Sequence, residues 1–384
     1  MLTLAIKNIK SSYYTSNPTY WWHHPVKYSC KFKVLANISM NDLLLRVIYV
    51  LFSSLLRKRR ITFASNFDRD IYLNLNALHE AVKKSGIKTK NTILFRCPDT
   101  LWNRIRSLFV IAQSKVLVVD CSHYLVSKIL ISKKTKIVYV GHGGGCLKKM
   151  GYSRPSYRKR TPDKEKKLYG QYSYVLSTTS MFDENICINY NVTHKQLLRI
   201  GLPRTDILFR RENDIKNQLI HERIILFAPS YSWINGTRGY LWNFEFFDII
   251  AQRLGYKVWF SPHPDTPPSQ SIPSNWFDCS QKKLYEKIHI PVVLVTDVSS
   301  IMFDFCITSK PILIGDFYDS DADTWIPKTE LPGVNICKDY DDIHRFLSNL
   351  TLTKSSNELF HQQMDRCDGN ACDNFVRFIK RELL

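Results

Sequence analysis

The sequence predicts an α/β protein with two successive doubly wound domains, each built on a parallel sheet. From residue 61 onward, short runs rich in β-branched and aromatic residues alternate with helical patterns, which is typical of parallel strands joined by crossover helices. This alternation stops once, after GLPRTDILFRREND, and begins again at residue 223. The chain has 384 residues, 44% of them hydrophobic, which is more than one compact core usually holds, so two cores are expected.

The expected strands are short apolar runs. The first series is ITFAS (61–65), TILFR (92–96), VLVVD (116–120), KIVYV (136–140), YVLS (174–177) and LLRIG (197–201), and the second is RIILFAPS (223–230), KVWFSPH (257–263), PVVLVTD (291–297) and PILIGD (311–316). Helices are expected near 73–85, 101–113, 180–190, 243–254, 281–288, 299–308, 340–349 and 357–382. The chain thus divides into a basic N-terminal segment (1–60), two α/β domains (61–215 and 216–350) and a C-terminal helical extension (351–384).

The chain is strongly basic, with 54 Lys and Arg against 34 Asp and Glu and a formal net charge of +20. Such an excess indicates a polyanionic partner: nucleic acid, an anionic membrane surface or a phosphate-rich substrate. Much of the charge lies in residues 1–60 and 148–167. The ten cysteines form no CxxC pair, so reduced thiols in a cytosolic protein are expected, and no zinc site.

The longest apolar stretch is LLLRVIYVLFSSLL, residues 43–56, and RKRR (57–60) follows it. The stretch is shorter than the roughly 20 residues that span a bilayer, and the N-terminus does not resemble a signal peptide. We expect this stretch to lie in the membrane interface, with the basic residues at anionic headgroups. The alternative is a buried helix followed by a solvated run of charges.

The stretch TDVSSIMFDF, within residues 292–314, combines a buried strand, a tight polar turn and a helix. Ser299 and Ser300 fall at the expected helix start, where free backbone N–H groups and the helix dipole favour a phosphate. The alternative is that Asp297 or Ser299 merely caps the helix.

Two further strand ends carry candidate side chains. In FSPHPDTPP (260–268), His263 lies between two prolines that limit its backbone freedom, and its ring can donate to a phosphate oxygen; a purely structural histidine is the alternative. In GLPRTD (201–206), Arg204 offers a fork of donors suited to oxyanions. The same position could instead serve only as an interdomain hinge with an Arg–Asp pair.

Several other site types are not expected. The acidic run DSDADTWIPKTE (319–330) matches part of a calcium-loop pattern but has Thr324 where the loop needs glycine, so no metal site is predicted. The sequence also lacks a P-loop, a GxGxxG after a first strand and a GxSxG elbow.

Five short motifs, taken in order, resemble the CDP-glycerol glycerophosphotransferase family, which includes teichoic-acid primases, polymerases and related capsule enzymes. They are HG…LKKMG (142–151), GLPRTD (201–206), ILFAPSY (225–231), SPHP (261–264) and TDVSSIMFDF…KPILI (296–314). The resemblance covers roughly residues 61–350 and implies a GT-B architecture, in which two Rossmann-like domains face each other across a cleft. The family's usual WHGTPLKK has Gly141 in place of tryptophan here, and GGC adds a residue.

The resemblance also implies the roles of the residues. His142 would act as general base on an acceptor hydroxyl that attacks the β-phosphate of a CDP-alditol, and CMP would leave. His263, Ser299 and Ser300 would hold the pyrophosphate without a catalytic metal or cofactor. Asp304 and Arg204 are also expected to bind the donor. From their charge alone, Lys148, Lys149 and Arg204 are expected to add positive potential at the cleft.

The sequence therefore predicts a peripheral transferase on the cytoplasmic face of the cell membrane. It would move glycerol phosphate, or ribitol or another polyol phosphate, onto a lipid-linked or surface-glycan acceptor, and no nucleic-acid partner is expected. Two alternatives remain open: a GT-B glycosyltransferase that uses a nucleotide sugar, and a noncatalytic basic protein that binds membrane or nucleic acid through residues 1–60.

Overall fold

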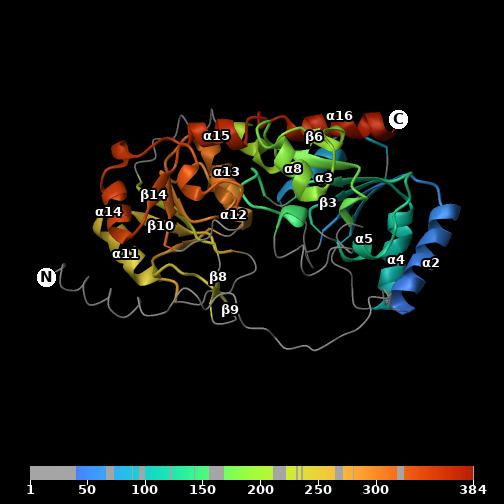
Figure 1. The fold of residues 1–384 in the computed structure, drawn as a ribbon, viewed down its shortest axis with the longest axis horizontal. Helices are drawn as coiled ribbons and strands as arrows, with labels where there is room; N and C mark the ends of the chain where they lie inside the picture. The colour runs from blue at the N-terminus through green and yellow to red at the C-terminus, as the bar shows by residue number, and fades with distance from the viewer. Residues whose placement is uncertain are drawn as a thin grey trace. The chain divides into compact units, whose positions relative to one another are not determined.

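Six parallel strands form a sheet in the first half of the chain (Figure 1). They are β1 (Arg60–Ala64), β2 (Lys90–Leu94), β3 (Ser114–Val119), β4 (Lys136–Tyr139), β5 (Tyr174–Ser177) and β6 (Leu197–Arg199). Their order across the sheet is β2-β1-β3-β4-β5-β6. Strands β1 and β3 are buried over nearly their whole length, as expected for a sheet with both faces covered.

A second sheet of six parallel strands follows. It contains β7 (Ile224–Ala228), β10 (Lys257–Phe260), β11 (Phe277–Asp278), β12 (Val293–Thr296), β13 (Ile312–Gly315) and β14 (Asn335–Cys337). The order β11-β10-β7-β12-β13-β14, counted from the first strand, is the 3-2-1-4-5-6 order of dinucleotide-binding folds. A small antiparallel hairpin, β8 (Ser232–Ile234) and β9 (Thr237–Gly239), lies outside this sheet. We call the parts around the two sheets the first and the second domain.

Helices surround both sheets. They are α2 (Met40–Leu55), α3 (Leu73–Lys84), α4 (Leu101–Ala112), α5 (Tyr124–Lys128), α8 (Asp183–Tyr190), α9 (Asp206–Arg210), α11 (Phe244–Arg253), α12 (Gln281–Lys287), α13 (Ile301–Phe305), α14 (Tyr340–Ser348), α15 (Asn357–Gln363) and α16 (Ala371–Leu383). Short 3₁₀ turns follow several loops, including Pro203–Thr205 and Cys306–Thr308. The predicted α/β class is confirmed, whereas β11, β14, the β8–β9 hairpin and α5 were missed because each is only two to five residues long.

The structure is a computed structural model, and it describes part of the chain. The described residues are 40–65, 73–88, 90–94, 100–121, 123–141, 143–154, 168–210, 222–230, 232–234, 237–263, 271–279, 281–317 and 324–383. The predictions for residues 1–39, for His142 and for most of the basic run 148–167 therefore lie outside the described residues.

The C-terminal segment differs from its prediction. One helical stretch was expected over 357–382, but α15 and α16 are separate helices, and Gly369 between them has a φ of +81° that ordinary residues avoid. Helix α15 belongs to the core of the second domain through Leu359, and α16 belongs to the core of the first domain through Phe375 and Ile379. The chain therefore returns to its first domain through residues 362–370, which we call the crossover segment.

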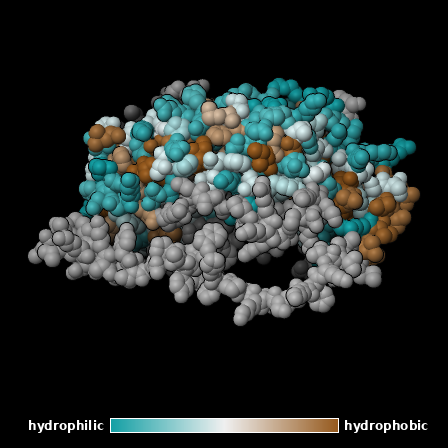
Figure 2. Space-filling view, viewed as in Figure 1, coloured by the Kyte–Doolittle hydropathy of each residue, from teal (hydrophilic) through white to brown (hydrophobic). Residues whose placement is uncertain are grey.

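Helix α2 is buried on one face and exposed on the other. Leu45 and Tyr49 are 1% and 2% exposed and join the core of the first domain, and α2 packs on α4. The opposite face remains apolar (Figure 2): Leu43, Leu44, Val47, Val50, Leu51 and Leu55 on α2, with Leu101, Trp102 and Phe109 on α4, are all exposed. We call these nine residues the α2–α4 surface. Among the described residues, no helix has the length and apolar character needed to cross a membrane.

Candidate functional site

Three neighbouring strands of the second domain end beside one another. Strand β7 lies between β10 and β12, and all three run in parallel, so their carboxyl ends meet at one edge of the sheet. His263 follows β10, Ser230 follows β7, and Ser299 and Ser300 follow β12. The chain order reverses between β7 and β12, and a crevice at such a switch point is where open α/β sheets bind their ligands.

The turn after β12 is fixed by a buried carboxylate. Asp297 is 1% exposed, and its two oxygens accept hydrogen bonds from the backbone N–H of Ser230 (2.8 Å) and the indole Nε1 of Trp242 (3.3 Å). Ser300 is the N-cap residue of α13, yet its side chain makes no capping hydrogen bond. The hydroxyls of Ser299 and Ser300 make no hydrogen bond within the described residues, which leaves both available to a ligand.

His263 is held by its backbone. Its N–H donates to the hydroxyl oxygen of Tyr240 (3.0 Å), and Tyr240 itself is 2% exposed within the aromatic core of the second domain. Burial raises the pKa of Tyr240, so this hydroxyl stays neutral at physiological pH. The His263 residue remains half-buried at the strand end. The structure therefore brings His263, Ser299 and Ser300 to the same edge of one sheet, as the sequence predicted.

The glycines that follow β4 pack directly on the second domain. A Cβ placed on Gly143 would lie 3.4 Å from Ser300 Oγ, and one on Gly145 would lie 2.7 Å from the ring of Phe303 in α13. Gly145 also has a φ of +65°, which favours glycine. We call Gly143–Cys146 the glycine loop. Gly145 serves close packing between the two domains, because a side chain at this position would clash with Phe303 of α13.

His142 lies outside the described residues, but both of its neighbours are described. Gly143 lies beside Ser300, since a Cβ on it would lie 3.4 Å from Ser300 Oγ, and the carbonyl of Gly141 accepts a hydrogen bond from Asn74 Nδ2 (3.2 Å). Asn74 is fully buried at the start of α3, and its Oδ1 accepts from the backbone N–H of Arg204 (3.3 Å). Gly141 is therefore joined through Asn74 to Arg204 of GLPRTD, and Gly143 lies beside the turn that follows β12.

Lys148 and Lys149 lie where the two domains also meet. Lys148 forms an isolated antiparallel bridge with Thr324, and the Trp325 N–H donates to the Leu147 carbonyl (2.7 Å). The Lys149 ammonium lies 5.7 Å from the centre of the Trp325 ring, within the range of a cation–π contact. Lys148 is exposed, so its charge can contribute to the potential at this junction.

Arg204 and Asp304 form a buried ion pair that joins the two domains. Arg204 Nε donates to Asp304 Oδ1 (3.0 Å) and Nη2 donates to Oδ2 (2.7 Å), and the two side chains are 3% and 1% exposed. The hydroxyl of Tyr285 donates to the same carboxylate (2.9 Å). Both side chains were predicted to hold the donor directly. This geometry instead favours the alternative interpretation of Arg204, in which it forms an interdomain Arg–Asp pair. Its partner in that pair is Asp304 of α13.

Several residues of this region were missed by the sequence interpretation. Ser230 follows a buried strand, and the same strand-end rule that identified His263 would have found it. Asp297 was considered only as a helix cap, whereas its carboxylate holds Ser230 and Trp242. Asn74 and Gln363 carried no such signal. Among the described residues, no group of three or more His, Cys, Asp or Glu side chains is placed to hold a metal ion.

Comparison with known proteins identifies relatives of the whole described region. The sequence profile of the family described as CDP-glycerol:poly(glycerophosphate) glycerophosphotransferase matches residues 45–380. A teichoic acid poly(ribitol-phosphate) polymerase of Bacillus spizizenii is 24% identical over 90% of this chain and 57% of its own length. A teichoic acid glycerol-phosphate primase of Bacillus subtilis is 27% identical over 72% of this chain and 76% of its own length. The chain thus spans little more than half of the first relative.

Solved structures agree with the fold. The wall teichoic acid polymerase TagF superposes with a TM-score of 0.75 at 16% identity, over 90% of this chain and 94% of that one. A UDP-GlcNAc 2-epimerase of Methanocaldococcus jannaschii superposes with a TM-score of 0.51 at 12% identity, over 84% of this chain and 99% of that one. The predicted two-domain, GT-B-like architecture is confirmed, and so is the predicted family resemblance.

Proposed function

Because the chain belongs to the CDP-glycerol:poly(glycerophosphate) glycerophosphotransferase family, we propose that it transfers glycerol phosphate, or a related polyol phosphate, from a CDP-linked donor. The acceptor is a lipid-linked or surface-glycan hydroxyl in the synthesis of a teichoic-acid-like or capsule polymer. The observation that supports the proposal is the close approach of Gly143, the residue after His142, to Ser300. The chain next to the HG motif of the first domain thus lies beside the strand-end edge of the second domain, where we propose that the donor phosphates bind.

In the proposed reaction, the acceptor oxygen attacks the β-phosphorus of the donor. A new P–O bond forms, the bond between the β-phosphorus and the bridging oxygen breaks, and CMP leaves with that oxygen. His142 takes the proton of the attacking hydroxyl. Ser299, Ser300 and His263 donate hydrogen bonds to the pyrophosphate and stabilise the charge that develops on the leaving group.

The proposal is tested by measuring the release of CMP. Purified protein is incubated with CDP-glycerol or CDP-ribitol and a lipid-linked acceptor, and His142→Ala should abolish transfer while binding of the donor persists. Ser299→Ala together with Ser300→Ala should weaken donor binding instead. Absence of CMP release with both donors under conditions that keep the protein folded would refute the donor class.

Two rival functions make different predictions. A glycosyltransferase with the same fold would bind UDP-sugars in preference to CDP-alditols, and competition binding separates the two. A noncatalytic basic protein would retain its cellular role in the His142→Ala variant and would lose it when residues 1–60 are deleted. Family membership favours the CDP-alditol enzyme over both.

We further propose that the enzyme works at the cytoplasmic face of the cell membrane and that the α2–α4 surface contacts the lipids. Exposed apolar side chains on two packed helices, with Leu55 79% and Trp102 67% exposed, suit insertion at the headgroup boundary. Arg57 and Arg59 beside them are exposed and can reach anionic headgroups.

The other two residues of RKRR do not fit the predicted role. Lys58 Nζ donates to the Ala112 carbonyl (2.6 Å), and Arg60 donates to the side chains of Gln113 and Thr92. These cations anchor the end of α2 to the end of α4. The predicted contact of all four residues with headgroups is therefore reduced to Arg57 and Arg59.

Vesicle sedimentation tests the membrane proposal. Binding to vesicles that contain phosphatidylglycerol should fall with salt and in the variant Arg57→Gln/Arg59→Gln, and it should fall further in Val50→Ser/Leu51→Ser. Lys338→Gln/Arg345→Gln, which removes two exposed charges near α14, is the matched control. Equal loss in the control, or dimerisation of the wild type that depends on Val50 and Leu51, would contradict the proposal.

A further inference from the structure

The crossover segment lies against three consecutive strand ends of the first domain. After β4, the N–H of Cys146 donates to Gln363 Oε1 (2.8 Å). After β5, the carbonyl of Thr178 accepts from the N–H of Arg366 (3.2 Å). After β6, a Cβ on Gly201 would lie 2.5 Å from the Arg366 carbonyl oxygen, so only glycine allows this approach. A segment more than 200 residues away in sequence thus borders the loop that begins with the HG motif.

Two side chains hold the glycine loop by its backbone. The N–H of Gly145 donates to Thr178 Oγ1 (3.2 Å), and the N–H of Cys146 donates to Gln363 Oε1. Thr178 Oγ1 in turn donates to the Gln363 carbonyl (3.2 Å). Gln363 is 0% and Thr178 5% exposed, so water cannot easily replace these acceptors.

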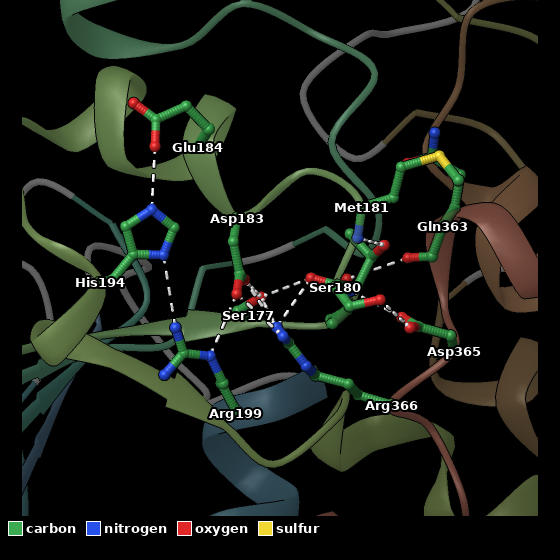
Figure 3. A network of polar contacts seen from close by, with 12 residues as sticks. Ser177, Ser180, Met181, Asp183, Glu184, His194, Arg199, Gln363, Asp365 and Arg366 are labelled. Atoms are coloured by element: carbon green, nitrogen blue, oxygen red, sulfur yellow. Dashed lines mark hydrogen bonds and ion pairs between the residues drawn. The ribbon is translucent and has the colours of Figure 1, made fainter.

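Gln363 is itself held in place by its surroundings. Its Nε2 donates to Gln362 Oε1 (3.1 Å), which orients the amide so that Oε1 faces Cys146. Further along, Ser180 N–H donates to Asp365 Oδ1 (2.8 Å) and Arg366 pairs with Asp183 (Figure 3). Gln363, the acceptor for Cys146, therefore belongs to a segment that is fixed at several points.

We propose that Gln363 and Thr178 are positioning residues of the transfer reaction. They hold the glycine loop, which follows His142 in the chain, beside Ser300, at the strand-end edge where the donor phosphate is proposed to bind. The inference rests on the proposed function for its chemistry, and on the two backbone hydrogen bonds for its geometry. Neither side chain contacts the reacting atoms in this account.

Loss of either acceptor leaves a buried N–H without a partner, and the loop can relieve this only by moving. A displacement of about 1 Å at a reacting group can lower a rate about 100-fold. Gln363→Met, which keeps the side-chain length but removes the acceptor, should therefore lower kcat about 10- to 100-fold. The KM for the CDP-linked donor should change less than about threefold, because the serines belong to the other domain.

Two matched comparisons separate positioning from general damage. Thr178→Val should behave like Gln363→Met, whereas Thr178→Ser, which restores the hydroxyl, should recover most of kcat. Glu358→Gln changes an exposed side chain in the first turn of α15 and should retain nearly wild-type kcat. If Thr178→Ser is as slow as Thr178→Val, or if Glu358→Gln is as slow as Gln363→Met, the proposal is wrong.

Amide hydrogen exchange supplies a readout that does not depend on the reaction. Exchange at Gly145 and Cys146 should accelerate in Gln363→Met and Thr178→Val and stay slow in the two control variants. If the amides of Gly145 and Cys146 exchange faster in Gln363→Met or Thr178→Val while kcat is unchanged, the inference is wrong. A wild type that releases no CMP from either donor, yet shows the exchange pattern, would instead overturn the proposed function while the loop anchors stand.

Discussion

Two ion-pair groups fasten the first domain to the rest of the chain, and they differ in their access to water. Arg204 and Asp304 are 3% and 1% exposed and join the first domain to α13. Asp183 is 10% and Arg366 17% exposed, and they join α8 to the crossover segment. Arg199, which also donates to Asp183 (3.0 Å), is 41% exposed. The first group is enclosed by protein, whereas the second, which Figure 3 shows, is partly exposed to solvent.

The difference shows that similar contacts can have unlike energetic roles. A buried pair has given up hydration on both partners, so its net contribution is small, but an unpaired survivor is very costly. When one partner of a partly exposed pair is replaced, water can hydrate the remaining charge instead. The Arg204–Asp304 pair is therefore suited to specify how GLPRTD meets α13, and the Asp183 group is suited to add modest stability that depends on pH.

The largest effect is expected from breaking the buried pair on one side only. Arg204→Met or Asp304→Leu alone should lower the free energy of unfolding by about 3–5 kcal/mol, because each leaves a buried charge without its partner. The double variant should recover most of that loss. Urea unfolding of the three variants measures the coupling, and losses that simply add would show that the pair is not enclosed as described.

A smaller effect is expected from Arg366→Met. Its guanidinium donates to both Asp183 oxygens, at 2.6 and 2.9 Å. A hydrogen bond to a charged group typically contributes about 1.5–3 kcal/mol to stability. Because Arg199 and Ser177 still donate to Asp183, we expect a loss of about 2 kcal/mol in urea unfolding. If Arg366→Met lowers the free energy of unfolding as much as Asp304→Leu does, the difference in exposure between the two ion-pair groups has no energetic consequence.

The same group should also give the protein a measurable acid sensitivity. Burial raises the pKa of Asp183, but hydrogen bonds from Arg366, Ser177 and Arg199 outweigh this and lower the pKa from 3.8 to about 2. The folded state therefore binds the proton less tightly than the unfolded chain does. Stability from this group is fully present above pH 4 and is lost as the pH falls from 3.8 to about 2.

Comparison of the wild type with Asp183→Asn isolates this contribution. The difference in the free energy of unfolding between the two proteins should shrink by about 2 kcal/mol between pH 5 and pH 2.5. Asp341→Asn, which changes an exposed carboxyl on α14, serves as the control for the general effect of removing a carboxylate. If the difference in the free energy of unfolding between the wild type and Asp183→Asn stays constant from pH 5 to pH 2.5, the hydrogen bonds from Arg366, Ser177 and Arg199 do not stabilise the charged carboxylate.

The strand ends of the second domain illustrate what the sequence makes predictable. Ser299, Ser300 and His263 follow apolar runs whose parallel arrangement could be inferred from their alternation with helices, so their shared edge followed from local patterns. The family resemblance added roles to positions that this reasoning had already selected. Short elements such as β14 (Asn335–Cys337) carry too few residues for a pattern.

The glycine loop illustrates what the sequence does not make predictable. Three consecutive glycines suggest freedom of the backbone, but Gly145 packs on Phe303 and Cys146 is bonded to Gln363, 217 residues away. Such contacts depend on how α15 returns the chain to its first domain. Gln363 and Asn74 lie on ordinary helical stretches, and only the positions of their distant partners distinguish them from surface amides.

The smallest effect is expected from an ion pair that is exposed to solvent. Lys257 and Glu222 contact each other at 2.5 Å but are 65% and 53% exposed, and such pairs typically contribute between zero and about 1 kcal/mol. Lys257→Met and Glu222→Gln should each change the free energy of unfolding by less than about 0.5 kcal/mol, and the effect should vanish in 1 M salt. The N–O distance of this pair is shorter than those of Arg366–Asp183 and Arg204–Asp304. A loss of stability comparable to that of Arg366→Met would therefore mean that the N–O distance, rather than burial, decides how much each pair contributes.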